Sequence, residues 1–286
     1  MNYSAFNERF LNILAYYLNY NENAVSADAI NAVKSAGVDE ATAFALIVAE
    51  GAGVDTAGKD RAFFNEYFLP SIKKLSVEDY YLDAYFRYIR FDDKKSGDFE
   101  LKYLTAKPYQ GFVRDDFLYF ENGKVLPQIG FFSTEYRYPA ALQNGREWMT
   151  LLPNEINSQI KYIDAAFGKV LTYGLGLGYY VLHAALKDSV ESVTVVDIDK
   201  NVIELFKENV LPQFPAEARA KVKIVCKDAF LFAKGLKSGD YDYIYADIWH
   251  DVGDGAELIK KFKSLEKFCP TARYGYWIED TIKYYL

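Results

Sequence analysis

Cysteine, histidine and long apolar runs are scarce in this sequence, and each scarcity argues against a class of protein. The chain has only 2 Cys, Cys226 and Cys269, and 2 His among 286 residues. Two cysteines cannot form the disulfide framework of a small secreted domain. No apolar stretch approaches the ~20 residues of a membrane-spanning helix, and the polar start MNYSAFNERF does not resemble a signal peptide. We therefore expect a cytoplasmic protein with no membrane partner.

Basic residues are outnumbered and scattered. The chain carries 33 Lys and Arg against 40 Asp and Glu, for a net charge of −7. Its basic runs are no longer than a dipeptide such as Lys260–Lys261, whereas a protein that follows a phosphate backbone needs a basic face. The short N-terminal helices could be mistaken for a DNA-reading domain, but their faces are acidic and alanine-rich. We expect no nucleic-acid partner.

Aromatic residues are unusually abundant. The sequence has 25 Tyr and 21 Phe, and an apolar fraction of 51% with 26% charged residues is typical of a folded globular protein. One interpretation is a core and rim built from bulky side chains. The alternative is an aromatic-walled pocket for a flat or cationic ligand.

Residues 1–95 are predicted to form a helical N-terminal region. Helical spacing places Phe6, Phe10, Leu14, Tyr17 and Leu18 on one face. Capping and breaking residues then predict further helices: Ser26 to Gly37, Asp39 to Glu50, Arg61 to Leu69 ending at Pro70, and Tyr80 to Ile89 behind a capping box at Ser76 and Asp79.

Residues 96–158 are predicted to form a β-hairpin region and a connector. From Phe99 to Phe132 the hydrophobic period changes towards that of strands. Asn122–Gly123 separates two apolar runs, and this dipeptide favours a hairpin turn because both residues tolerate positive φ. The segment from Ser133 to Ser158 is interpreted as the connector.

Residues 159–286 alternate between strand and helix patterns. The expected strands are Lys169–Tyr173, Ser192–Val196, Val222–Cys226, Tyr241–Ala246 and Arg273–Ile278, with helices at Tyr180–Leu186, Lys200–Asn209, from Phe230, and at Ala256–Phe268. Crossovers of this length imply a Rossmann-like, doubly wound and mainly parallel sheet. The fold class is therefore α/β.

The glycine-rich turn after the first of these strands predicts a nucleoside site. Gly174, Gly176 and Gly178 allow backbone to approach a ligand closely, and the following helix offers its free N–H groups. The spacing is G-x-G-x-G, and Tyr179 stands where a dinucleotide fold needs a small residue. The pattern therefore disfavours NAD and FAD.

Acids follow three further strands and should share one rim with Gly174, because ligands bind at the carboxyl ends of parallel strands. Asp197 is interpreted as a ligand of ribose hydroxyls or as a solvated acid. Asp228 contacts adenine, caps the next helix, or does both. Asp247 is the catalytic candidate, as a proton acceptor or orienting carboxylate, or else an acid that caps a loop.

The loop that begins at Asp247 raises a metal-binding alternative. Its residues Asp247, His250, Asp251 and Asp254 could hold a divalent ion only if several of them converge. A plain polar loop is the favoured interpretation, and we predict no metal.

From Ile160 to Ile278 the sequence resembles the class I S-adenosylmethionine-dependent methyltransferases. The carrying motifs are YGLGLGY, VVDID, KDAF and ADIWHD. The resemblance implies S-adenosyl-L-methionine as cofactor, bound by Tyr173, Gly174, Gly176, Gly178, Asp197, Ile198, Asp228 and Ala229.

Within that fold, VVDIDKNVIELFKENVLPQF resembles the spermidine synthases, as does the β-hairpin region that precedes it. Two motifs depart from that branch: its glycine loop carries an Asp where Leu177 stands, and its fourth strand ends Asp-Ser-Ser-Asp where this chain has Asp247, Ile248, Trp249 and His250. The resemblance further implies that Glu147 and Trp148 close the pocket as substrate-side residues. Trp249 is interpreted as a wall of the substrate pocket, with His250 beside it, or as a cover of the helix that follows.

Because of these departures, we predict methyl transfer to an unidentified small-molecule acceptor. The alternatives are a spermidine-synthase-like aminopropyltransferase that uses decarboxylated S-adenosylmethionine, and a non-catalytic nucleoside-binding protein of the same fold. The C-terminal antiparallel hairpin of methyltransferases is expected to be missing, because little sequence follows Ile278. A homodimer is left open.

Overall fold

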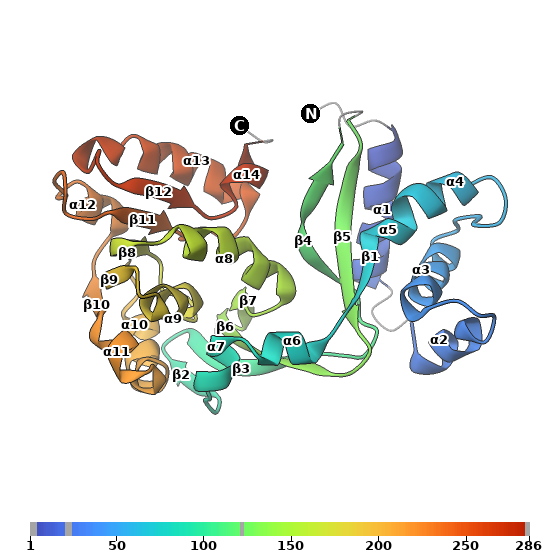
Figure 1. The fold of residues 1–286 in the computed structure, drawn as a ribbon, viewed down its shortest axis with the longest axis horizontal. Coiled ribbons are helices and arrows are strands. Elements are labelled where there is room, and N and C mark those ends of the chain that lie inside the picture. Colours follow the sequence, from blue (N-terminus) through green and yellow to red (C-terminus); the bar gives the residue numbers. More distant parts are fainter. Residues whose placement is uncertain (1–4, 21–24, 121–122, 284–286) are drawn as a thin grey trace. The chain divides into compact units, whose positions relative to one another are not determined.

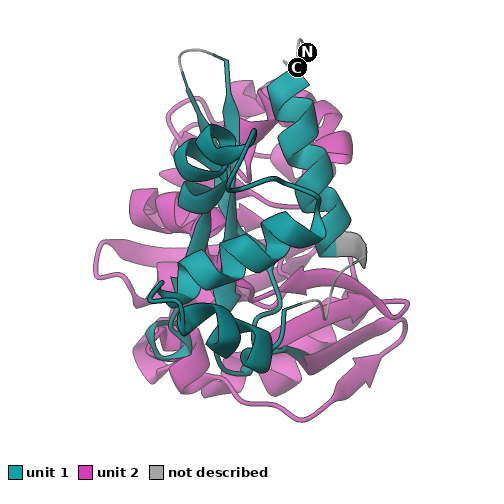
Figure 2. Ribbon diagram, turned by 90° about the vertical axis from the view of Figure 1, so that its right-hand side faces the viewer, with its two compact units in different colours: residues 1–80, 105–138 teal, residues 81–104, 139–286 magenta. Residues whose placement is uncertain are grey.

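The computed structural model describes residues 5–20, 25–120 and 123–283. The chain divides into two compact units, each built from two segments: residues 1–80 with 105–138, and residues 81–104 with 139–286 (Figure 2). These units differ from the predicted ranges 1–95, 96–158 and 159–286. Residues 81–104 and 139–158 group with the C-terminal Rossmann-like sheet.

The first unit contains most of the predicted N-terminal helices (Figure 1). Three of them are α1 (Ala5–Tyr20), α2 (Ala27–Lys34) and α3 (Glu40–Gly51). A further helical stretch is made of α4 (Arg61–Phe63), a π-helical turn (Phe64–Phe68) and α5 (Leu69–Ser71). Ser26 and Asp39 cap α2 and α3 as predicted, each accepting a bond from the backbone N–H three residues on. Pro70 is the second-last residue of this stretch, which ends at Ser71, close to the predicted end at Pro70. Aromatic rings fill this core, where Phe44 and Phe131 stack with their centroids 4.2 Å apart.

A three-stranded sheet completes the first unit. Its central strand β5 (Val125–Phe132) pairs antiparallel with β4 (Phe112–Tyr119) and parallel with β1 (Ile72–Leu75). The hairpin prediction is confirmed by the β4–β5 pairing. Asn122 of the predicted turn lies outside the described residues, and Gly123 has φ +79°. The sequence analysis missed β1, which is only four residues long.

The segment that begins the second unit differs from its prediction. The single helix expected from Tyr80 to Ile89 is broken into α6 (Val77–Tyr81) and α7 (Ala84–Tyr88). The proposed capping box does not form, since the Ser76 hydroxyl donates to Glu78. Asp83 instead caps α7 by accepting a bond from the Tyr85 N–H, so a second N-cap starts a second helix.

The predicted connector from Ser133 to Ser158 is wrong. It contains the strands β6 (Tyr136–Gln143) and β7 (Arg146–Thr150) and the start of helix α8 (Pro153–Ala165). With β2 (Lys94–Ser96) and β3 (Phe99–Ala106) the two strands form a sheet of order β2-β3-β6-β7. Asn144–Gly145 joins β6 to β7 with φ +52° and +75°. This dipeptide is the hairpin signal that could have identified the pair.

The C-terminal part of the second unit is the predicted α/β fold. Its five strands are parallel in the order β10-β9-β8-β11-β12. The elements are β8 (Gly168–Tyr173), α9 (Tyr179–Leu186), β9 (Val190–Asp197), α10 (Lys200–Asn209), a 3₁₀ turn (Leu211–Gln213), α11 (Ala216–Ala220), β10 (Val222–Cys226), α12 (Ala229–Ala233), β11 (Tyr243–Ala246), α13 (Val252–Lys263), a 3₁₀ turn (Glu266–Phe268), β12 (Arg273–Tyr276) and α14 (Glu279–Ile282). Within the described residues, β12 is followed by α14 and by no antiparallel strand.

Helices cover both faces of this sheet, as a doubly wound fold requires. On one face the ring of Tyr245 packs against Tyr162 of α8 and Tyr180 of α9. On the other face Tyr173 packs against Phe232 of α12 and Phe262 of α13.

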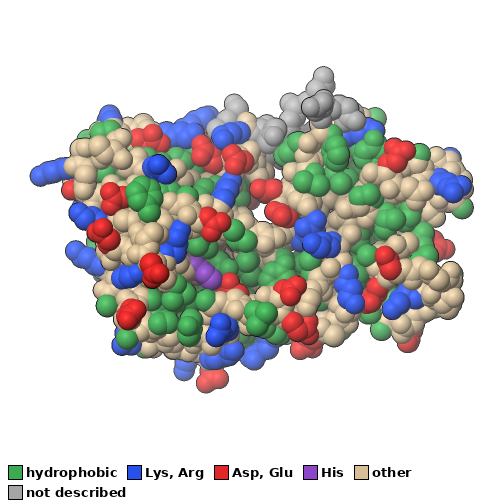
Figure 3. Space-filling view, viewed as in Figure 1, with side chains coloured by type: hydrophobic (Ala, Val, Ile, Leu, Met, Phe, Trp, Pro, Cys, Tyr) green, Lys and Arg blue, Asp and Glu red, His purple; other side chains and the backbone are tan. Residues whose placement is uncertain are grey.

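Two properties of the described structure concern the membrane and nucleic-acid partners that the sequence argues against. Among the described helices, none combines the length and the apolar character needed to cross a bilayer. On the face drawn in Figure 3, Lys and Arg side chains are interspersed with Asp and Glu and do not gather into a basic surface.

Candidate functional site

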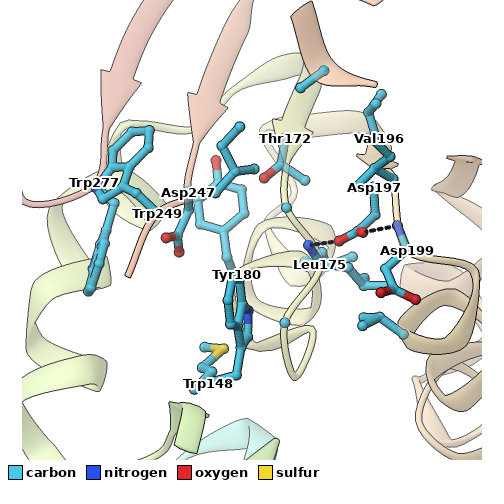
Figure 4. Close-up of a pocket in the computed structure, with 18 of the residues that line it drawn as sticks. Trp148, Thr172, Leu175, Tyr180, Val196, Asp197, Asp199, Asp247, Trp249 and Trp277 are labelled. Carbon is cyan, nitrogen blue, oxygen red and sulfur yellow. Dashed lines mark hydrogen bonds between the residues drawn. The ribbon is translucent and has the colours of Figure 1, made fainter. Parts of the chain in front are cut away.

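A cavity of about 270 Å³ lies where the strands of the parallel sheet end, and every residue that lines it belongs to the second unit. Gly174, Asp197, Asp228 and Asp247 all line it, which confirms that these strand ends share one rim. In Figure 4, Asp247, Trp249 and Trp277 lie on one side of the cavity, and Leu175, Asp197 and Asp199 lie on the other.

The glycine loop is built so that side chains are excluded from it. Gly174 has φ +95°, and a Cβ there would overlap the carbonyl oxygen of Asp247. Gly176 has φ +49°, and a Cβ there would overlap Sδ of Met149. That sulfur also accepts a bond from the Leu177 N–H at 3.3 Å, so Met149 of β7 packs directly on the loop. Leu177 itself is fully buried, and its carbonyl accepts a bond from the Tyr85 hydroxyl at 2.8 Å.

Asp197 ties the glycine loop to the end of β9. Its carboxylate accepts bonds from the Leu175 N–H at 3.0 Å and from the Asp199 N–H at 2.8 Å (Figure 4). Burial raises the pKa of the Asp197 carboxyl, and the hydrogen bonds from Asp199 and Leu175 oppose that shift. Asp199 in turn caps α10 through the Asn201 N–H. Ile198 between them is 68% exposed, so an apolar face borders the cavity here.

Asp228 is the N-cap of α12, because its side chain accepts a bond from the Leu231 N–H at 2.8 Å. The capping role that the sequence allowed is therefore real. Asp228 and the buried Ala229 also line the cavity, so the capping carboxylate remains next to any ligand there.

Asp247 follows β11 on the opposite side of the cavity. Burial raises the pKa of its carboxyl to about 7, and the Tyr245 hydroxyl, 3.3 Å from Oδ2, opposes that shift. A carboxyl with this pKa can exchange a proton near neutral pH, which is the property required of a general base.

Glu155 and Gln159 were missed by the sequence analysis. They lie one turn apart on α8, Glu155 inside the predicted connector and Gln159 just after it, and both line the cavity. Burial, with repulsion from Asp247 and Glu147, raises the pKa of the Glu155 carboxyl to about 8. Gln159 is 1% exposed, and neither of its amide atoms has a hydrogen-bond partner. Their i, i+4 spacing places both on one face of the helix, but the sequence does not show that this face meets the cavity.

All three tryptophans of the chain, Trp148, Trp249 and Trp277, line this one cavity, together with Tyr180 and Tyr245. Aromatic residues therefore build both the core of the first unit and a pocket in the second. The two interpretations of the aromatic content apply to different parts of the molecule.

The remaining predicted site residues lie outside the cavity lining. Because side chains alternate along β8, Thr172 faces the cavity and Tyr173 packs on the far side of the sheet. Gly178, with φ +77°, starts α9 against Phe206. His250 contacts the edge of the Trp148 ring, with centroids 4.2 Å apart, and Glu147 is exposed on β7.

The loop acids that raised the metal alternative are used to start a helix. Asp251 and Asp254 form a capping box on α13, and Asp254 also accepts a bond from the His250 N–H. Across residues 5–20, 25–120 and 123–283, no group of three or more His, Cys, Asp or Glu side chains is arranged to hold a metal ion.

The charge of the cavity has one sign. Among the described residues that line it there is no Lys, Arg or His. The lining includes five carboxylates, which are those of Glu155, Asp197, Asp199, Asp228 and Asp247. Carboxylates that are not balanced by basic groups favour a cationic ligand, and the tryptophan rings add to that preference.

Residues 165–269 match the family model of the spermine/spermidine synthase domain. The similarity is to spermidine synthases. Spermidine synthase 2 of Arabidopsis thaliana is 30% identical over 151 residues, which are 51% of this chain and 40% of that protein. A polyamine aminopropyltransferase of Alkaliphilus oremlandii is 30% identical over 128 residues, 42% of each chain. The chain thus matches about two fifths of the length of these relatives.

Among solved structures, the spermidine synthase of Thermotoga maritima is similar at 19% identity and a TM-score of 0.30, over 38% of this chain and 42% of that one. The prediction of a methyltransferase is wrong, because the family model and these curated relatives are synthases of polyamines. The match extends across both departures from the spermidine synthases, at Leu177 and after Asp247.

Proposed function

We propose that this chain transfers an aminopropyl group from decarboxylated S-adenosylmethionine to an amine and releases methylthioadenosine. The observation that carries the proposal is the cavity with five carboxylates, three tryptophans and no basic side chain among the described residues. Both substrates of this reaction are cations, and the match to the spermine/spermidine synthase domain covers the loop, Asp197, Asp228 and Asp247.

The adenosine part of the donor fits the side of the cavity that contains Asp197. There the bare backbone of Gly174 and Gly176 leaves room for the ligand, and Asp197 would accept bonds from the ribose hydroxyls. Ile198 and Ala229 offer apolar surfaces for the adenine ring, and Asp228 would contact its amino group. We call this side the donor end.

The cavity favours the decarboxylated donor over S-adenosylmethionine itself. The ordinary donor carries a carboxylate that needs a cation or free N–H groups. The described lining supplies no cation, and the Leu177 N–H of the glycine loop is already bonded to Met149. Decarboxylation removes the anionic group and leaves two positive charges, which suit an acidic cavity.

The reaction itself needs orientation and one proton acceptor. The acceptor nitrogen attacks the carbon next to the sulfonium, the new C–N bond forms, and the electrons of the broken C–S bond remain on sulfur as methylthioadenosine leaves. Holding the two reactants in line supplies much of the acceleration. Asp247 would take the proton that the nitrogen releases, and we call the side of the cavity with Asp247, Trp249, Trp277, Glu155 and Gln159 the acceptor end.

The direct test incubates the purified chain with decarboxylated S-adenosylmethionine and 1,4-diaminobutane and measures methylthioadenosine by chromatography. We expect amine-dependent release, and none when S-adenosylmethionine replaces the donor. The proposal fails if methylthioadenosine binds but no amine in a series of mono- and diamines supports its formation. Methylation of an amine by S-adenosylmethionine would also contradict it.

A further inference from the structure

The carboxylates of the cavity fall into two groups by their hydrogen bonds. Asp197, Asp199 and Asp228 each accept backbone N–H groups at the donor end. At the acceptor end Asp247 has one long bond from Tyr245, and the half-buried Glu155 carboxyl accepts no hydrogen bond from the described residues. A carboxyl on the cavity wall that is not used by the protein's own donors can pair with a cationic group of a ligand.

We propose that Glu155 binds the second, non-reacting ammonium group of a diamine acceptor and so determines that a diamine is preferred over a monoamine. This inference rests on the proposed function and adds to it a residue that reads the acceptor. Asp247 serves the nitrogen that reacts, and Glu155 serves the nitrogen that remains charged.

The surroundings of Glu155 fit a polar ligand. Gln159, one turn further along α8, is buried with both amide atoms unpaired, and the buried Tyr180 hydroxyl is also without a partner. Leaving a buried amide or hydroxyl unpaired is costly, so a ligand with polar groups is favoured here. Two further side chains that line the cavity with Glu155 therefore also lack a polar partner.

The wall beside this site is fixed, and the glycine loop offers no competing charge. The Trp277 indole N–H donates to the Ser158 hydroxyl at 2.8 Å, which holds its ring between α8 and the end of β12. Leu177 of the glycine loop is fully buried and apolar. The carboxylate for the second ammonium would therefore come from α8 and not from the glycine loop.

The test compares a diamine with a monoamine of the same length, so that the two ligands differ in the second ammonium group. Binding of 1,4-diaminobutane and of n-butylamine to the chain saturated with methylthioadenosine is measured by calorimetry, and quenching of tryptophan fluorescence provides a second readout. In the unmodified chain the diamine should bind about tenfold or more tightly, as expected for a buried charged contact. In Glu155→Gln, which keeps the shape of the side chain, we expect this preference to fall to about twofold or less.

Two further variants act as controls. Asp164→Asn removes an exposed acid from the same helix and should retain the full diamine preference. Glu155→Asp keeps the charge but withdraws it by one methylene, so it should retain part of the preference. Unchanged affinity for methylthioadenosine in all variants shows that the fold and the donor end are intact.

The inference is overturned if Glu155→Gln keeps the diamine preference, or if it weakens both amines equally. It is also overturned if neither amine binds the unmodified chain. The aminopropyl-transfer proposal fails separately: a preference that depends on Glu155, without any release of methylthioadenosine from the decarboxylated donor, supports the acceptor site and contradicts the reaction.

Discussion

The two ends of the cavity differ in how their polar groups are satisfied. At the donor end Asp197, Asp199 and Asp228 accept N–H groups from turns and helix starts, so the backbone itself fixes them. At the acceptor end Glu155 has no hydrogen bond from the described residues, and the amide of Gln159 is buried unpaired. The carboxylates of the donor end are held by the chain's own backbone, whereas polar groups at the acceptor end remain unpaired, which is what our proposal of an amine ligand requires.

This difference shows which functional residues can be recognised from the sequence next to them. A carboxylate that caps a helix, such as Asp228, is recognisable from its neighbours in the chain, and the sequence also placed Asp197 at the same sheet edge, where the cavity lies. A carboxylate that awaits a ligand has no such neighbours.

Removing the proton acceptor should affect the acceptor end alone. In Asp247→Asn we expect kcat for methylthioadenosine release to fall about a hundredfold or more, the usual contribution of a general base. The affinity for methylthioadenosine, measured by calorimetry, should stay within about twofold. A variant that loses both together would mean that the two ends are not separable.

Gly174→Ala should destabilise the contact between the glycine loop and the backbone of Asp247. A Cβ there would overlap the Asp247 carbonyl, and the residue has φ +95°. The unfavourable backbone conformation costs about 1–2 kcal/mol and the overlap a further 1–3 kcal/mol, so we expect the free energy of unfolding in urea to fall by roughly 3 kcal/mol. Gly145→Ala is the matched control, since Gly145 has φ +75° but open space around its Cα. An equal loss in both variants would contradict the close approach at Gly174.

Asp197→Ala should weaken the donor end. Losing a charged acceptor for ribose hydroxyls costs about 1.5–3 kcal/mol per bond, so the dissociation constant of methylthioadenosine should rise at least about tenfold by calorimetry. Asp188→Ala, at an exposed position after α9, should leave this constant unchanged. An unaltered constant in Asp197→Ala would show that the carboxylate only ties the loop to β9.

The acceptor end should respond to pH, and the donor end should not. The pKa of Asp247 is raised to about 7 and that of Glu155 to about 8, with Glu147 as a further acid nearby. Because both values exceed those of the unfolded chain, protonation of this pair favours the folded state. That contribution is present below about pH 4 and is lost as the pH rises through about 7 to 8.

An amine cation replaces the proton, so its binding should strengthen over the same range. We expect 1,4-diaminobutane to bind about tenfold more tightly at pH 8.5 than at pH 6, because binding displaces about one proton. Methylthioadenosine affinity serves as the control and should change little. Amine binding that is independent of pH would show that the acceptor pair is already ionised at pH 6.

Much of the fold could be predicted because its signals are local. The strand–loop–helix pattern around Gly174 and the caps at Ser26, Asp39 and Asp228 each involve residues within a few positions of one another. The connector failed for a related reason. β6 has 8 residues and β7 has 5, and the Asn144–Gly145 turn that joins them is a hairpin signal that our prediction does not use.

The sequence by itself determined the α/β order, the bare glycine loop and the acids that follow the strands, because helix and strand periods and turn residues act through near neighbours. The tertiary structure alone brings Glu155 and Gln159 of α8 into the cavity that Asp247 lines, and adds Trp277 to Trp148 and Trp249 there. These residues come from separate segments of the chain. Their convergence depends on how helices pack on the sheet, and no local pattern carries that information.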